Sequence, residues 1–111
     1  MRIPALIATL LIAASAHVAA AYPEKPIKIV MGFPAGGPQD QHARMLTDKL
    51  QAVLGQPFIV DYKPGAGGSV GAESVARGPA DGYTIMLANT GVMVINGALY
   101  SKLPYNTLKD F

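Results

Sequence analysis

The stretch IKIVMGFPAGGPQDQHARMLTDKLQAVL, from Ile27 to Leu54, decides the fold. Its opening run, Ile27 to Met31, is largely apolar and rich in β-branched side chains, which predicts a short strand buried on at least one face. A loop dense in Gly and Pro follows, from Gly32 to Pro38. Beyond the loop, apolar residues recur at helical spacing: Ala43, Leu46, Leu50, Val53 and Leu54. The stretch therefore predicts a strand, a loop and an amphipathic helix in succession.

Pro and Gly mark the two ends of this helix. Pro38 suits the first helical turn, because its missing N–H would have no partner there. Gly55 suits the position just after the last turn, and Pro57 prevents the helix from continuing. We therefore expect a helix over residues 38–54. The face that packs on the sheet is expected to contain Leu46, Leu50 and Val53.

The same pattern recurs further along the chain. A second strand is predicted at Phe58 to Tyr62, a loop at Lys63 to Gly68, a short helix at Ser69 to Ala76, a turn at Gly78 to Gly82, a third strand at Tyr83 to Leu87 and a polar loop at Ala88 to Gly91. Strands that alternate with helices predict an α/β fold with a parallel, doubly wound sheet. The residues from Leu103 to Phe111 show no strand or cap, so we expect them to form a connection.

The first 21 residues are typical of a signal peptide. A positive charge at Arg2 precedes an apolar run, and Ala19 to Ala21 offers a cleavage site. A membrane anchor is the alternative, but the apolar run is only about a dozen residues, whereas a spanning helix needs about 20. We therefore expect cleavage near Ala21 and a periplasmic chain that begins at Tyr22. Residues 22–111 suffice for one small domain.

The composition limits the possible partners. Without Arg2, eight basic residues face seven acidic ones, a net charge near +1. Lys and Arg are scattered singly, which gives no basic stripe for a nucleic acid. The chain has no cysteine, so its stability must come from a packed core.

Two Gly-rich loops are candidates for anion binding. In a parallel sheet, ligands bind beyond the carboxyl ends of the strands, where loops lead into helix N-termini. The loops Gly32 to Asp40 and Lys63 to Ser69 would both lie there, with free backbone N–H groups that suit a carboxylate or phosphate. The alternative is that these glycines only form tight turns. A dinucleotide site is disfavoured, because Gly71 comes one place too late after Gly65 and Gly67 for the G-x-G-x-x-G pattern.

Catalytic and metal-binding groups are scarce. The mature part has one histidine, His42, and no thiol, so we expect no catalytic residue, no metal site and no cofactor. Asp40 has two open roles. It would complement the dipole of the helix, or it would accept a hydrogen bond from a polar group of the ligand.

Four segments together resemble the tricarboxylate transporter receptors, also called Bug proteins. They are YPEKPIKIVMGFPAGGPQDQHARML (Tyr22 to Leu46), GQPFIVDYKPGAGGSVGAESVA (Gly55 to Ala76), PADGYTIMLANTG (Pro79 to Gly91) and INGALYSKLPYNTLKDF (Ile95 to Phe111). The resemblance implies a solute-binding receptor with the two-lobed, flytrap-like fold of type II periplasmic binding proteins. Such a receptor captures a small carboxylate and delivers it to membrane permease subunits, and we expect it to be a monomer.

The resemblance also implies that the ligand is held by backbone N–H groups and waters from three loops. With Asp40, the expected ligand-binding residues are Phe33, Pro34, Ala35, Gly36, Gly37, Gly65, Ala66, Gly67, Gly68, Ser69, Asn89, Thr90 and Gly91. Ala35, the pair Met93 and Val94, and Gly97 depart from the usual family residues, which bears on the identity of the ligand.

The family continues beyond the motif that ends at Phe111. We therefore expect residues 22–111 to be the N-terminal part of the first lobe, truncated before the second lobe. Two alternatives remain. The chain would be a small α/β module or enzyme that binds a nucleotide or phosphate, or it would be a fragment without activity.

Overall fold

The computed structural model describes residues 21–111. The predicted signal peptide, apart from Ala21, lies outside the described residues. The strands are β1 (Ile27–Met31), β2 (Phe58–Tyr62) and β3 (Thr84–Leu87), and the helices are α2 (Pro38–Leu54), η1 (Ala66–Gly68), α3 (Ser69–Ala76), η2 (Gly91–Ile95), α4 (Asn96–Leu99) and α5 (Thr107–Asp110). None of the described helices is long and apolar enough to cross a membrane.

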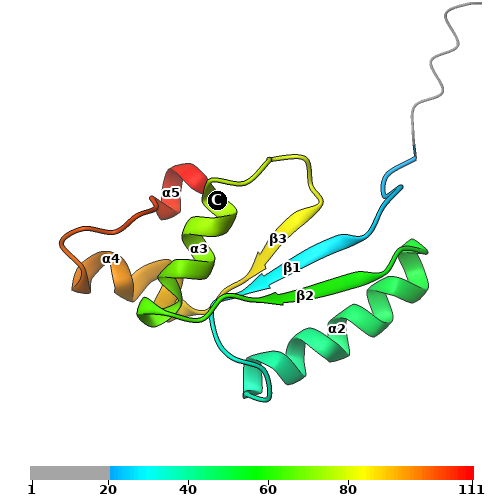
Figure 1. Ribbon diagram of the computed structural model, residues 1–111, viewed down its shortest axis with the longest axis horizontal. Coiled ribbons are helices and arrows are strands. Elements are labelled where there is room, and N and C mark those ends of the chain that lie inside the picture. The colour runs from blue at the N-terminus through cyan, green and yellow to red at the C-terminus, as the bar shows by residue number, and fades with distance from the viewer. Residues whose placement is uncertain (1–20) are drawn as a thin grey trace, which may run out of the picture.

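The three strands form one parallel sheet in the order β2-β1-β3. The last residue of β1, Met31, is level with Tyr62 of β2 and with Leu87 of β3. All three carboxyl ends therefore meet at the same edge, as the arrows in Figure 1 show. This arrangement confirms the predicted parallel α/β sheet.

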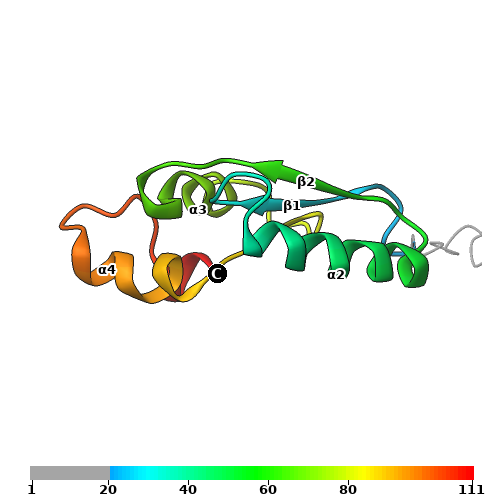
Figure 2. The same ribbon diagram turned by 90° about the horizontal axis from the view of Figure 1, so that it is seen from below.

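Helices cover both faces of the sheet. On one face, Ile29 and Met31 of β1 pack against Ala43 of α2 in a buried cluster. Figure 2 shows α2 on this side of β1 and β2. A second buried cluster joins Ala72 of α3 to Val92, with Met86 of β3 packed against it. Since successive side chains of a strand point to opposite faces, Met86 and its neighbour Leu87 serve different clusters.

Glycines bring α3 unusually close to the end of β1. A Cβ atom on Gly32 would lie 2.7 Å from the Cα of Gly68, and one on Gly71 would lie 3.0 Å from the Cα of Gly32. Distances this short leave no room for a side chain at either position. The contact fixes the start of α3 against the loop that follows β1, and it thereby places two of the three candidate loops next to each other.

Three details of the expected fold are wrong. The third strand begins at Thr84 rather than Tyr83. In α2 the buried residues are Asp40, Ala43 and Thr47, whereas Leu46 is 45% exposed and Val53 81% exposed. The expected packing face is thus rotated away from the sheet.

The third error concerns the end of the chain, where a connection without a cap was expected. Residues 107–110 form helix α5, and Asn106 caps it by accepting hydrogen bonds from the backbone N–H groups of Leu108 and Lys109. Asn is a favoured N-cap residue because its short side chain reaches these donors. The segment is therefore locally ordered by its own cap.

Candidate functional site

Three loops follow the carboxyl ends of the strands. We name them the first loop (Phe33–Gly37), the second loop (Gly65–Ser69) and the third loop (Asn89–Gly91). Within residues 21–111, several of their backbone N–H groups have no hydrogen-bond partner: those of Ala35, Gly37, Ala66, Gly67, Thr90 and Gly91. Unpaired N–H groups near helix N-termini are the donors that bind anions in many proteins. The three loops therefore offer backbone donors that suit an anion, without a cationic side chain.

A hollow of about 360 Å³ lies between the first and third loops. Its lining residues are Phe33, Pro34, Gly37, Pro38, Gln39 and Asn89. The volume is at the lower end of the roughly 300–1,000 Å³ that is usual for small-molecule sites. Four of the lining residues, Phe33, Pro34, Gly37 and Asn89, were expected from the sequence to contact a ligand. Gln39 was not singled out.

Gln39 connects the start of α2 to the end of β3. Its Nε2 donates a hydrogen bond of 2.7 Å to the carbonyl oxygen of Leu87. Its Oε1 is buried and has no hydrogen-bond partner among the described residues. A buried amide oxygen of this kind is a place where an ordered water or a donor group of a ligand binds. No sequence pattern marks this role, because the partner of Gln39 is 48 residues away.

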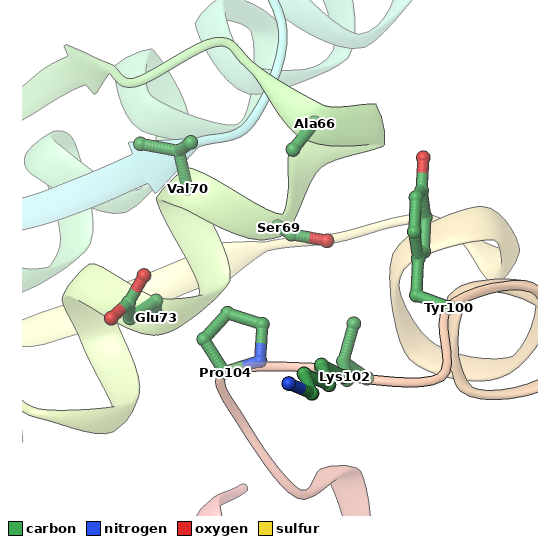
Figure 3. A pocket seen from close by; sticks show the side chains of 8 residues that line it. Ala66, Ser69, Val70, Glu73, Tyr100, Lys102 and Pro104 are labelled. Atoms are coloured by element: carbon green, nitrogen blue, oxygen red, sulfur yellow. The ribbon is translucent and has the colours of Figure 1, made fainter.

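A smaller hollow of about 120 Å³ borders the second loop. Figure 3 shows Ala66 and Ser69 on one side of it and Tyr100 and Lys102 on the other. Its volume is well below the usual range for a ligand site. The body of a small ligand therefore fits better between the first and third loops, and the second loop would contribute only its free N–H groups.

The second loop owes its shape to residues with left-handed backbone. Gly65, Gly67 and Gly68 have φ values of 137°, 61° and 89°, and Ala66 has a φ of 48°. Side chains are disfavoured in this region of φ. At Gly68 a Cβ atom would also lie 2.5 Å from Cγ2 of Val92. These glycines are therefore required by the fold itself.

The first loop is less constrained. Gly36 has a φ of 88°, but a Cβ atom there would meet nothing within 4 Å. Gly37 has an ordinary φ of −80°, and a Cβ atom would lie 3.9 Å from its nearest neighbour, the carbonyl oxygen of Pro34. Gly37 lines the larger hollow. The absence of a side chain here keeps the hollow open rather than making the turn possible.

Asp40 is buried beneath the first loop, only 3% exposed. Its carboxylate accepts hydrogen bonds from the Gly36 N–H at 2.9 Å, the Tyr62 hydroxyl at 2.5 Å and the Arg44 Nε at 3.1 Å. The bond from Tyr62, followed by those from Gly36 and Arg44, lowers the pKa of Asp40 below its usual value despite burial. Asp40 is therefore ionised and already bonded within the chain. The contact with Gly36 supports a role in holding the first loop. This role differs from the two that the sequence suggested, which were complementing the helix dipole and accepting a hydrogen bond from a ligand.

A second buried polar group, Asn96, holds the second loop. Its Nδ2 lies 3.0 Å from the carbonyl oxygen of Gly67 and 3.1 Å from Oγ of Ser69. The Tyr105 hydroxyl, 3.5 Å from the same nitrogen, donates to the carbonyl oxygen of Val92 at 2.5 Å. Neither Asn96 nor Tyr105 was predicted from the sequence to have a role in the site. Asn96 belongs to α4, whose helical structure its sequence pattern did not indicate, and Tyr105 lies in the non-helical connection between α4 and α5.

His42 and Lys63 line neither of the two hollows. His42 is exposed on α2. Lys63, beside the second loop, lies 3.9 Å from Asp61. No group of three His, Cys, Asp or Glu residues in the described part of the chain is placed to hold a metal ion.

Comparisons with known proteins bear on the family and the fold of the chain. Residues 42–111 match the sequence family described as tripartite tricarboxylate transporter family receptor. The protein BugT of Bordetella pertussis is 41% identical over 90 residues, which are 80% of this chain and 28% of BugT.

Three solved structures share the fold. The periplasmic binding protein BugD matches with a TM-score of 0.77 and 40% identity over 81% of this chain and 30% of BugD. MatC of Rhodopseudomonas palustris, solved with bound malate, has a TM-score of 0.77 and 37% identity, over 81% of this chain and 31% of MatC. R. palustris Rpa4515, solved with adipate, has a TM-score of 0.76 and 32% identity, over 78% of this chain and 29% of Rpa4515. The chain thus spans less than a third of the length of each of these four proteins.

Proposed function

Because the chain belongs to the tripartite tricarboxylate transporter receptor family, we propose that it forms the N-terminal part of a receptor for a small dicarboxylate. The family is one of receptors rather than enzymes. The receptor would act in the periplasm and deliver its ligand to the membrane permease of the transporter. In this chain the three loops at the carboxyl edge of the sheet would supply one side of the ligand site.

One observation carries the proposal. Each of the three loops has backbone N–H groups without a partner in the described chain, and all three loops lie at the same edge of the sheet. A hollow that can hold a small molecule lies between two of them. Backbone N–H groups at a helix N-terminus favour an anion typically by about 0.3–1 kcal/mol, and several converging donors add to this. An anionic ligand group is thus the best match to the donors present.

The relatives support a dicarboxylate in particular. Malate is bound in MatC and adipate in Rpa4515. Both molecules carry two carboxylates, and several loops that offer N–H groups suit a ligand with more than one anionic end.

The proposal is tested by an NMR titration of the ¹⁵N-labelled chain with malate and with adipate, and with sodium sulfate at equal ionic strength. We expect the dicarboxylates to shift the amide signals of Gly37, Gly67 and Thr90 more than sulfate does. Gly37→Val should abolish these shifts, because the side chain enters the hollow while the backbone conformation at this position suits any residue. The thermal midpoint of unfolding should stay near that of the parent chain.

Lys63→Ala is the matched control. It removes a charge beside the second loop without altering backbone shape, so dicarboxylate binding should persist. The proposal is wrong if Lys63→Ala abolishes the shifts while Gly37→Val leaves them intact. It is also wrong if sulfate reproduces the full response to malate and adipate, because the loops would then bind anions without selecting carboxylates.

A further inference from the structure

The carboxylate of Asp40 joins three separate parts of the molecule. Asp40 lies in the first turn of α2 and its partners are Gly36 of the first loop, Tyr62 at the end of β2 and Arg44 one turn further along α2. Arg44 also donates a hydrogen bond of 3.1 Å to the Tyr62 hydroxyl. Asp40, Arg44 and Tyr62 thus each bond to the other two, and the first loop joins them through the N–H of Gly36 alone.

The burial of Asp40 needs an explanation beyond the helix dipole. An exposed acidic residue in the first turn would complement the dipole equally well. Burying a carboxylate instead carries a desolvation cost that only well-made hydrogen bonds offset. Of the three bonds that the buried carboxylate accepts, the one from Gly36 fixes a loop whose glycines leave the backbone free to adopt other shapes.

We propose that Asp40 is a positioning residue that holds the first loop in the shape in which the N–H groups of Ala35 and Gly37 are unpaired and open to an anion. This inference rests on the proposed function of the loops. By its charge alone, Asp40 would repel an anionic ligand nearby. Its effect on the shape of the loop and its effect as a charge therefore have opposite signs, and the two can be separated.

The substitution Asp40→Asn removes the charge and replaces one accepting oxygen by an NH₂ group, which cannot accept the hydrogen bonds that the carboxylate accepts. If Asp40 positions the loop, hydrogen exchange of the Gly36 amide should accelerate by about tenfold or more, the lower end of what a hydrogen bond to a charged group contributes. Exchange in the middle of α2 should change little. Asp48→Asn is the matched control, because it removes the same charge from an exposed position of the same helix.

Tyr62→Phe provides a second route if the Asn variant unfolds. It removes only the hydroxyl that binds the other oxygen of the carboxylate. Exchange of the Gly36 amide should then accelerate severalfold, less than in Asp40→Asn. Unchanged exchange at Gly36 in both variants would overturn the inference, since the loop would keep its shape without the carboxylate.

The sign of the binding effect gives an independent readout. Amide shifts on titration with malate should show weaker binding by Asp40→Asn than by the parent chain or by Asp48→Asn. Tighter binding by Asp40→Asn would mean that Asp40 acts through its charge and would refute a positioning role. If the parent chain itself does not respond to malate or adipate, the proposed function fails, while the exchange of Gly36 still decides whether Asp40 holds the loop.

Discussion

At position 68 the fold requires glycine for two separate reasons. Gly68 has a φ of 89°, and a Cβ atom there would lie 2.5 Å from Cγ2 of Val92. A left-handed backbone costs a residue with a side chain roughly 1–2 kcal/mol, and overpacking a buried site adds about 1–3 kcal/mol. We expect Gly68→Ala to lower the free energy of unfolding by about 2–5 kcal/mol, measured by urea denaturation.

Gly36→Ala is the comparison for this measurement. Gly36 has almost the same φ, 88°, but open space around it, so only the backbone term of about 1–2 kcal/mol applies. Equal losses in the two variants would show that the contact with Val92 relaxes without cost and that close packing does not fix the second loop.

The bond between Tyr62 and Asp40 has a consequence for acid stability. It is the largest of the effects that lower the pKa of Asp40. A carboxyl group whose pKa is lower in the folded than in the unfolded state contributes stability that is complete above its unfolded pKa and is lost as pH falls through the folded value. Tyr62→Phe raises the folded pKa towards the unfolded one. We therefore expect the acid-unfolding midpoint, followed by circular dichroism, to move to higher pH in this variant.

Tyr100→Phe should leave the acid midpoint where it is. It deletes the same atom from a residue that is 43% exposed and whose hydroxyl makes no hydrogen bond within the described chain. An equal shift in both variants would mean that the acid transition is governed by other carboxylates, among them Asp81, whose pKa is lowered chiefly by the bond from the Tyr83 N–H.

Single residues of the site were predictable from sequence only where local spacing carries the information. The glycines of the first and second loops follow strands directly, so their place at the sheet edge could be inferred. Asp40 was a candidate because it lies in the first turn of a predicted helix, but its bond to Gly36 could not be foreseen from spacing. Gln39 and Asn96 were missed altogether, since their partners are 48 and 29 residues away. Contacts that span such distances depend on the tertiary fold.

At the level of elements, the buried face of α2 leads to a paired prediction. Ala43 is fully buried against Ile29 and Met31. Ala43→Leu should cost about 1–3 kcal/mol of unfolding free energy because the added atoms must displace well-packed neighbours. Leu46→Ala should change it by no more than about 0.5–1 kcal/mol, because Leu46 is 45% exposed. A larger loss in Leu46→Ala than in Ala43→Leu would mean that the apolar stripe, and not the Ala43 face, packs on the sheet.

The difference between the expected and the observed packing face of α2 shows what helical periodicity can and cannot predict. The bounds of the helix were correct, because Pro38 and Gly55 mark its ends. The apolar stripe was also present, but the closest approach to the sheet uses the small residue Ala43. A hydrophobic pattern identifies large apolar side chains and overlooks small ones at the tightest contacts. The short helices near the end of the chain were missed for a related reason, since four or five residues are too few to show a period.

For the whole molecule, the order of elements in the sequence was enough to predict the topology. Alternating strands and helices allow few arrangements, and right-handed connections leave the parallel sheet as the expected one. The same rule brings all three loops to one edge. What the sequence left open is how closely the loops approach, which depends on the absence of side chains at Gly32, Gly68 and Gly71.

The central position of β1 predicts how the whole fold opens. β1 is bonded to a strand on each side, and Ile29, Val30 and Met31 are no more than 1% exposed. β1 is the central strand of the sheet, and both buried clusters pack against this sheet. Separating β1 from its neighbours therefore requires the packing on both faces of the sheet to be lost. Helix α5, in contrast, has four residues and none of them is buried.

We expect the amides of β1 to exchange with solvent only through global unfolding and the amides of α5 to exchange at least roughly a hundredfold faster. Native-state hydrogen exchange in low urea separates the two cases, because exchange in β1 should accelerate with urea along the global unfolding curve while exchange in α5 stays flat. If β1 exchanges as fast as α5, the two faces open independently and the sheet is not the cooperative centre of the molecule.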